Sequence, residues 1–251
     1  MANLVAEPLF SIIVPTLNVE STIAACLGSI ARQTCLDYEV VLMDGASQDR
    51  TLAIVAEHEP QLAGRLSTHV GQDEGIYDAM NRGVALARGQ WLFFLGADDS
   101  FYQDDVLARI AVFLGQNPSC HLAYGDVIMR SDGSRYGGVF ALDTLLFRRN
   151  ICHQAIFYRR ELFAHLGPYN LRYRIWADWD FNIRCFSNPA LVARHLDIVV
   201  ANYNDTGGLS QREDPELQKR LPLPFLSGFA RRWAGRLVRA AKSAKRIPRR
   251  Q

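Results

Sequence analysis

The sequence has no apolar run that approaches the ~20 residues needed to cross a bilayer, which argues against an integral membrane protein. It also has no basic segment followed by an apolar stretch at its start, the pattern of a secretory signal peptide. Its five cysteines are odd in number and form no C-x-x-C pair, which argues against a disulfide framework or a zinc site. We therefore expect a cytoplasmic protein with reduced thiols.

Acidic residues are missing from the end of the chain. None follows Glu216, whereas eleven lysines and arginines do, so the last part of the chain carries +11. The residues up to Glu216 hold the other 17 basic side chains and all 26 acidic ones, a net charge of −9. We therefore expect a mildly acidic domain over residues 1–215 and a cationic extension over 216–251.

Apolar residues recur at helical spacing within this extension, among the basic ones. From Phe225 onward they are Phe229, Trp233, Leu237, Ala240 and Ala241. A basic amphipathic helix with an aromatic anchor is typical of a segment that lies on an anionic membrane surface. The pattern predicts a peripheral position on the inner face of the cell membrane; a disordered basic tail or a nucleic-acid contact is the alternative.

Strands and helices alternate in the first half of the sequence. Expected strands at 10–14, 38–43, 66–70 and 91–95 are separated by helices ending near 33, 58 and 87, which predicts βαβ units and a parallel sheet. Past residue 120 the pattern is mixed. It predicts strands at 121–129, 136–140, 155–158 and 191–201 and helices at 161–165 and 174–186. The sequence thus predicts an α/β fold with a Rossmann-type nucleotide-binding half, a mainly parallel central sheet and a mixed second half.

Two adjacent carboxylates follow the apolar strand at 91–95. Gly96 and Ala97 end the strand, and Asp98 and Asp99 come next. Ligands of open α/β sheets bind beyond the carboxyl ends of the strands, and two acids there suit a divalent cation that holds a diphosphate. The alternative is that the acids cap a helix starting near Gln103.

A second acidic cluster lies on the predicted helix 174–186. Asp178 and Asp180 are ~200° apart on a helix, so only one of them can face a given site. Asp180 lies beside the apolar stripe and suggests a buried, hydrogen-bonded structural acid, which leaves Asp178 to meet a ligand. The alternative for Asp178 is a helix N-cap, worth roughly 0.5–2 kcal/mol.

Six segments in order resemble the family 2 glycosyltransferases, which are inverting enzymes with the GT-A fold. The resemblance covers about residues 9–210 and is closest to members that build bacterial capsular, exopolysaccharide or O-antigen chains. The segments read S-I-I-V-P-T-L-N-V-E (11–20), V-L-M-D-G-A-S-Q-D-R-T (41–51), Q-D-E-G-I-Y-D-A-M-N-R-G (72–83), W-L-F-F-L-G-A-D-D (91–99), C-H-Q-A-I-F-Y-R-R (152–160) and A-D-W-D-F-N-I-R (177–184).

The resemblance implies roles for residues of both halves. Asp98, with Asp99, would bind Mn²⁺ or Mg²⁺ on the donor diphosphate, and Asp178 would be the general base. His153 and Gln154 would border the acceptor together with the loop at 207–208, although a hydrogen-bonded structural histidine is the alternative for His153. Pro15, Thr16 and Asn18 would line the nucleotide pocket, and Asp44 would accept a hydrogen bond from the base. Asp73 and the segment Gly75–Asn81 would flank the nucleotide and its phosphates.

The implied reaction moves a sugar from a nucleotide diphosphate sugar to a hydroxyl of a lipid-linked saccharide in one in-line displacement. The chain departs from the family pattern where acids are usual, with Gly45, Gly96 and Ala177 instead. These losses leave a non-catalytic sugar-nucleotide-binding protein as one alternative. A sugar nucleotidyltransferase is another, although P-T-L-N-V-E after the first strand is not the glycine- and basic-rich loop that such an enzyme requires.

Overall fold

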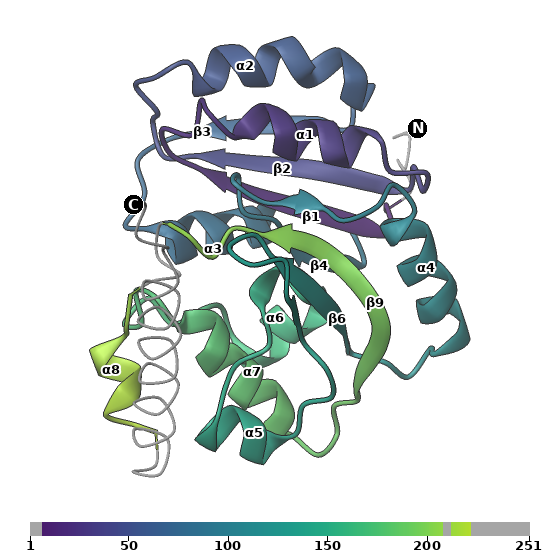
Figure 1. Cartoon of the computed structure of the whole chain (residues 1–251), viewed down its shortest axis with the longest axis vertical. Coiled ribbons are helices and arrows are strands. Elements are labelled where there is room, and N and C mark those ends of the chain that lie inside the picture. The colour runs from purple at the N-terminus through teal and green to yellow at the C-terminus, as the bar shows by residue number, and fades with distance from the viewer. Residues whose placement is uncertain (1–6, 208–211, 222–251) are drawn as a thin grey trace, which may run out of the picture.

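The computed structural model describes residues 7–207 and 212–221, in which helices cover both faces of a nine-stranded sheet (Figure 1). In the first half, four strands pair in parallel in the order β3-β2-β1-β4. The alternation predicted from the sequence is therefore confirmed. The elements are β1 (Phe10–Thr16), α1 (Ile23–Ala31), β2 (Tyr38–Asp44), α2 (Thr51–His58), η1 (Glu59–Leu62), β3 (Leu66–Val70), α3 (Ile76–Leu86) and β4 (Trp91–Phe94).

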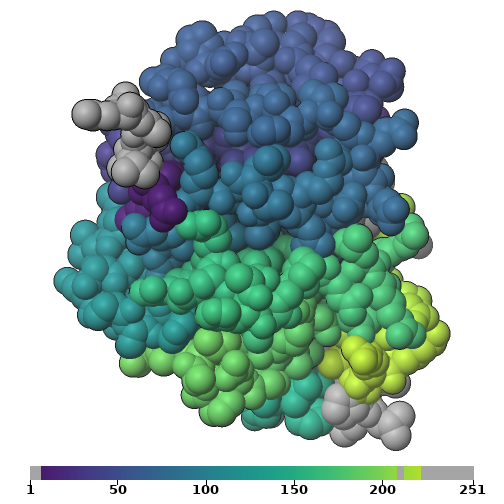
Figure 2. All heavy atoms as spheres, turned by 180° about the vertical axis from the view of Figure 1, so that it is seen from behind, coloured from purple at the N-terminus to yellow at the C-terminus, as the bar shows by residue number. Residues whose placement is uncertain are grey.

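The second half continues the same sheet with mixed strand directions. β8 (Ile156–Arg159) runs antiparallel to β4 and to β6 (Leu122–Met129), and β9 (Ala193–Tyr203) runs parallel to β6. Two short strands, β5 (Ser100–Phe101) and β7 (Arg135–Tyr136), pair antiparallel with β9 and β6. The helices are α4 (Val106–Gln116), α5 (Leu142–Phe147), η2 (His153–Ala155), α6 (Glu161–Leu166), α7 (Ala177–Ser187) and α8 (Pro215–Gln218). From behind, the two halves form one continuous surface (Figure 2).

The central strands are apolar throughout because each of their faces meets a separate core. In β1, Ile12 and Val14 pack with α1 and α4, whereas Ile13 packs with α3 and with the helices of the second half. The whole of β1, β2 and β4 is buried. A strand that is covered on both faces has a continuous run of apolar residues and no apolar/polar alternation. The sequence therefore could not show which side chains face which layer.

Two predicted elements between residues 100 and 140 differ from the structure, and one helix was not predicted. The helix expected near Gln103 begins at Val106, after β5, so Asp98 and Asp99 do not cap it and that alternative is wrong. The strand expected over 136–140 ends at Tyr136, because the backbone N–H of Gly138 donates to the Asp126 carboxylate, at 2.7 Å, instead of to a neighbouring strand. No element was predicted over α5.

The helix expected from residue 174 begins at Ala177. The backbone N–H groups of Ile175 and Trp176 donate to the carboxylate of Asp214, at 2.9 and 3.2 Å, so this turn is held by a residue that lies after β9. The amphipathic segment predicted from Phe225 onward lies outside the described residues. Within the part described, none of the helices combines the length and apolarity that a membrane span requires.

Candidate active site

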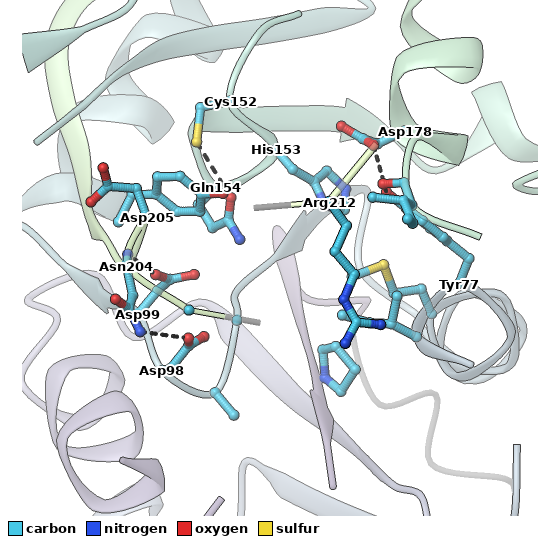
Figure 3. A pocket seen from close by; sticks show the side chains of 18 of the residues that line it. Tyr77, Asp98, Asp99, Cys152, His153, Gln154, Asp178, Asn204, Asp205 and Arg212 are labelled. Carbon is cyan, nitrogen blue, oxygen red and sulfur yellow. Dashed lines mark hydrogen bonds between the residues drawn. The ribbon is translucent and has the colours of Figure 1, made fainter. Parts of the chain in front are cut away.

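A cavity of about 780 Å³ opens beyond the carboxyl ends of β1 and β4 and is lined by both halves of the chain. Figure 3 shows Asp98, Asp99 and Asn204 on one side of it, Asp178 and Tyr77 on the other, and His153 and Gln154 between them. The cavity lining contains nine of the residues predicted from the sequence: Pro15, Thr16, Asn18, Asp73, Asp98, Asp99, His153, Gln154 and Asp178. Asp44 and Asn81 do not line it.

Asp98 and Asp99 are held in the cavity wall by the residue that follows β9. The backbone N–H of Asn204 donates to Asp99 Oδ1 at 2.6 Å, and its side-chain amide donates to Asp98 Oδ2 at 2.8 Å. The pairing of β5 with β9 places Asn204 there. Burial, and after it the negative charge of Asp98, raises the pKa of Asp99 to about 7. The positive charge of Arg130 thus offsets only part of the effect of burial and of Asp98.

This donor set fits a divalent cation of the Mg²⁺ or Mn²⁺ type. Two adjacent carboxylates supply hard oxygen ligands, and their mutual repulsion is what a cation would relieve. Among residues 7–207 and 212–221, no group of three or more His, Cys, Asp or Glu is placed to hold a metal ion. Mg²⁺ is commonly bound by one or two carboxylates together with substrate phosphates, so two protein ligands are sufficient for such a site.

Gly96 leaves room for the Asp99 carboxylate. A Cβ atom at position 96 would lie 2.4 Å from Asp99 Oδ2 and 3.1 Å from Asp98 Oδ1. A side chain at position 96, where the resemblance implies an acid, would therefore collide with the carboxylate of Asp99. The acidic character of this wall is kept although its sequence pattern is altered.

Asp178 lies in the first turn of α7 and is 7% exposed. The N-cap is Trp176 and no side chain caps the helix, so the N-cap alternative for Asp178 is wrong. Its Oδ1 accepts a hydrogen bond from the Tyr77 hydroxyl at 2.5 Å, and its Oδ2 accepts one from the Asn150 amide at 2.7 Å. Burial and the charge of Asp178 raise the pKa of Tyr77 well above its usual range, so Tyr77 stays protonated and donates.

Asp180 points away from the cavity, as its angular separation from Asp178 requires. It forms an ion pair with Arg184 at 3.0 Å, and Arg184 also donates to the backbone carbonyl of Leu166 at 2.6 Å. Asp180 is therefore a structural acid that ties α7 to the end of α6. Asp180 was expected to be buried, but it is half-buried, and Asp178 is buried instead because α7 turns Asp178 and Asn182 inward.

The loops after β1 and β2 are tied together beside the cavity. Asn18 has a positive φ of 51° and accepts from the Gln48 N–H at 2.8 Å. The Asp44 carboxylate accepts from the Thr16 hydroxyl at 2.9 Å and from the Ser47 N–H and hydroxyl at 2.8 and 2.7 Å. Asp44 is 2% exposed, so the structure shows it stabilising the loop and does not place it on the cavity surface, where a nucleotide base was expected.

Asn81 joins two segments of the chain and does not lie on the cavity surface, where a nucleotide contact was expected. Its side chain donates to the backbone carbonyl of Tyr169 at 3.0 Å and accepts from the N–H of the same residue at 2.9 Å. Asp73, by contrast, lines the cavity and accepts from the Gly75 N–H at 2.9 Å. Gly75 begins α3 with φ 125°, a conformation that L side chains rarely adopt.

His153 is a hydrogen-bonded histidine that also lines the cavity. Its ring stacks on Phe94 with 5.0 Å between centroids, and its Nε2 lies 2.9 Å from the Tyr169 hydroxyl. Burial lowers its pKa, so it is neutral at neutral pH. Neighbouring Gln154 accepts a hydrogen bond from the Cys152 thiol at 3.4 Å.

Sequence reasoning did not single out Tyr77, which lies in the predicted segment 75–81, and it missed Asn150, Asn204 and Arg212; all four line the cavity. Arg212 lies there because Asp214, two residues later, binds the turn before α7 and also caps α8 through the N–H of Glu216. The Tyr77 signal was available within the motif G-I-Y-D-A-M-N. The other three stand in loops, where single-sequence patterns carry no such signal.

A mixed sheet of this topology, with acids on both sides of one cavity, is typical of glycosyltransferases with the GT-A fold. Residues 11–166 match the model of "Glycosyl transferase family 2". The chain belongs to this family and is a glycosyltransferase. A "PGL/p-HBAD biosynthesis glycosyltransferase" of Mycobacterium tuberculosis (strain ATCC 25177 / H37Ra) is 60% identical over 242 residues, covering 94% of both chains. A relative of the same name and the same figures comes from Mycobacterium bovis (strain BCG / Pasteur 1173P2).

Solved structures agree in fold. S. aureus TarS 1-349 in complex with UDP-GlcNAc superposes with a TM-score of 0.66 at 22% identity, covering 81% of this chain and 61% of that one. The mannosyltransferase PcManGT of Pyrobaculum calidifontis, in complex with GDP-Man and Mn²⁺, gives 0.60 at 23% identity, covering 79% and 57%. This chain thus spans about three fifths of the length of either. The predicted GT-A-like fold is confirmed, and the sugar nucleotidyltransferase alternative is excluded by the family.

Proposed function

We propose that the protein is an inverting glycosyltransferase that moves a sugar from a nucleotide diphosphate sugar to an acceptor hydroxyl, with Asp178 as the general base. The observation that carries this proposal is that Asp178 and the Asp98–Asp99 pair line one cavity from opposite sides (Figure 3). With a divalent cation bound, the Asp98–Asp99 side would suit the charged diphosphate, and the Asp178 side would suit a hydroxyl that must lose a proton. The anomeric carbon would lie between them.

The reaction balances as a single displacement. The acceptor oxygen attacks the anomeric carbon, its proton passes to Asp178, and the bond between the anomeric carbon and the phosphate oxygen breaks. The nucleoside diphosphate leaves with the electron pair of that bond, and the configuration inverts. A general base in this position typically supplies about 10²–10⁴-fold in rate.

The remaining roles concern the donor. Asp98 and Asp99 would hold Mn²⁺ or Mg²⁺, which when bound stabilises negative charge on the departing diphosphate. Pro15, Thr16, Asn18 and Asp73 line the side of the cavity next to the first βα loops, where α/β sheets bind nucleotides. A solved structural neighbour with bound UDP-GlcNAc and another with GDP-Man and Mn²⁺ support a donor and a cation of these kinds.

The acceptor is proposed from the relatives and from the extension. Relatives at 60% identity are named for PGL/p-HBAD biosynthesis, and we propose that this protein acts in a biosynthesis of that type, on a saccharide acceptor linked to a lipid. The basic extension, residues 216–251, would hold the enzyme on the inner face of the cell membrane. His153 and Gln154 border the cavity between the two acidic sides and would contact the acceptor.

The deciding experiment assays nucleoside diphosphate release from a panel of nucleotide sugars with Mn²⁺ or Mg²⁺ and a saccharide acceptor. Asp178→Asn should lower kcat by about 10²–10⁴-fold and leave donor binding within about twofold of wild type. Asp180→Asn is the matched control, because it removes an acid from the same helix that does not line the cavity. Transfer at the wild-type rate by Asp178→Asn would refute the base assignment.

A further inference from the structure

The carboxylate of Asp178 stands at the end of a chain of side chains that begins deep in the protein. The Tyr158 hydroxyl donates to Asn182 Oδ1 at 2.8 Å, Asn182 Nδ2 donates to Asn150 Oδ1 at 2.9 Å, and Asn150 Nδ2 donates to Asp178 Oδ2 at 2.7 Å. Tyr158 and Asn182 are 0% exposed, and neither lines the cavity. These hydrogen bonds thus connect the protein core to Asp178.

The chemistry of these groups allows one direction only. An ionised carboxylate accepts hydrogen bonds and cannot donate, whereas an amide has a donor end and an acceptor end. Asn150 must therefore turn its NH₂ toward Asp178 and its oxygen toward Asn182, which must in turn offer its own NH₂. The oxygen of Asn182 then needs a donor, and the Tyr158 hydroxyl supplies it.

Two properties of the neighbours keep this direction fixed. Burial raises the pKa of Tyr158 well above its usual range, so its hydroxyl remains a donor. Reversing both amides would set the oxygen of Asn150 against Asp178 Oδ2 with no hydrogen between them. Such a contact between two buried acceptors costs free energy, because each of them loses its partner.

We propose that Asn150 is a positioning residue for Asp178, and that Asn182 and Tyr158 fix the orientation of its amide. Asn150 holds one carboxylate oxygen and Tyr77, from α3, holds the other, so the carboxylate plane is set by two separate elements. Both donors are neutral, so they orient the carboxylate without cancelling its charge. Each oxygen keeps a second lone pair for the acceptor hydroxyl. This inference rests on the proposed role of Asp178 as the base.

The test is a double-mutant cycle on kcat in the full chain, with nucleoside diphosphate release as the assay. Asn150→Ala should lower kcat by about 10–100-fold, the range for losing a hydrogen bond to a charged group, with the KM for the donor within about twofold. Tyr158→Phe should lower kcat by about 3–10-fold. In the Asn150→Ala background, Tyr158→Phe should change kcat by less than twofold, because its effect passes through Asn150.

Tyr38→Phe is the matched control. Tyr38 is also buried, and its hydroxyl donates to the carbonyl of Ile30 at 3.1 Å, on the face of the sheet that does not carry Asp178. This variant should leave kcat unchanged and lower the melting temperature about as much as Tyr158→Phe. If Asn150→Ala does not fold, Asn150→Ser takes its place in the cycle.

Two results would overturn the inference. One is a Tyr158→Phe variant with the kcat of the wild type, and the other is a full additional loss of kcat when Tyr158→Phe is combined with Asn150→Ala. Either result, found with an active wild type and an impaired Asp178→Asn variant, rejects the positioning chain alone. A wild-type rate in Asp178→Asn would instead reject the proposed function.

Discussion

A single methyl group at Gly96 tests whether the Asp98–Asp99 wall holds the cation. The Cβ of Gly96→Ala would lie 2.4 Å from Asp99 Oδ2, below the 3.0 Å that real Cβ atoms observe, so the carboxylate must move by at least 0.6 Å. The φ angle at Gly96 is not positive, so alanine fits the backbone itself. Asp99 is 2% exposed and its other oxygen is held by the Asn204 N–H, so the carboxylate cannot shift without disturbing that hydrogen bond.

The expected cost follows from the bond that must break. Asp99 Oδ1 accepts from the Asn204 N–H at 2.6 Å, and a hydrogen bond to a charged group is worth about 1.5–3 kcal/mol. Alanine in place of glycine adds about 0.4–1 kcal/mol to the free energy of unfolding, because it restricts the unfolded chain. The net loss is about 1–2 kcal/mol, or about 3–6 °C in melting temperature for a chain of this size. We expect the half-activating concentration of Mn²⁺ or Mg²⁺ to rise about 10–100-fold, since one of the two proposed protein ligands would be displaced.

The assay is nucleoside diphosphate release over a titration of each cation, with melting temperatures measured in parallel. Gly115→Ala is the control, because this glycine lies in α4 and its added Cβ would meet nothing within 4 Å. It should gain about 0.5–1 kcal/mol in stability and leave the cation requirement unchanged. A Gly96→Ala variant with the cation requirement of the wild type would show that the Asp99 carboxylate does not bind the cation.

Three further changes test other parts of the structure. Burial alone would raise the pKa of Glu39, but hydrogen bonds from a serine hydroxyl and from Arg88 lower it. The ionised Glu39 therefore stabilises the folded protein above its ordinary pKa of 4.5, and this contribution is lost as pH falls below that value. Glu39→Gln should therefore cost about 2 kcal/mol at pH 7, and much less at pH 3, in urea unfolding. Asn81→Ala should lose about 2 kcal/mol of stability with the donor KM within twofold of wild type; a large rise in KM would restore Asn81 as a nucleotide ligand. Truncation after Leu221 should abolish co-sedimentation with phosphatidylglycerol vesicles, and unchanged binding would contradict the membrane role of the extension.

Much of the fold was predictable because its signals are local. The first four strands and three helices are marked by apolar runs and by the breaks between them, and these were placed within a few residues. The turn before α7 was predicted wrongly as helix, because its backbone N–H groups donate to Asp214, some forty residues later in the chain. The extent of the short β7 escaped prediction for the same reason, since Gly138 bonds to the distant Asp126.

The candidate site divides in the same way. Asp98 and Asp99 could be predicted from the sequence, since acids that end a buried strand must lie at the edge of the sheet. For the acid on α7, the helical phase allowed a choice between Asp178 and Asp180 and favoured Asp178. The burial of each acid could not be predicted, because it depends on which helix face meets α3 and the loop that carries Asn150.

By itself, the sequence determined a parallel α/β half with a pair of acids at a strand end, and a basic extension. Each of these features depends on residues that are close together in the sequence. Only the tertiary structure decided that Asp178 faces those acids, that Asn204 joins the pair, and that Asn150 holds the carboxylate. Such contacts join residues from about 30 to about 100 positions apart in the chain. Their geometry comes from the sheet that both halves share, and no local pattern encodes it.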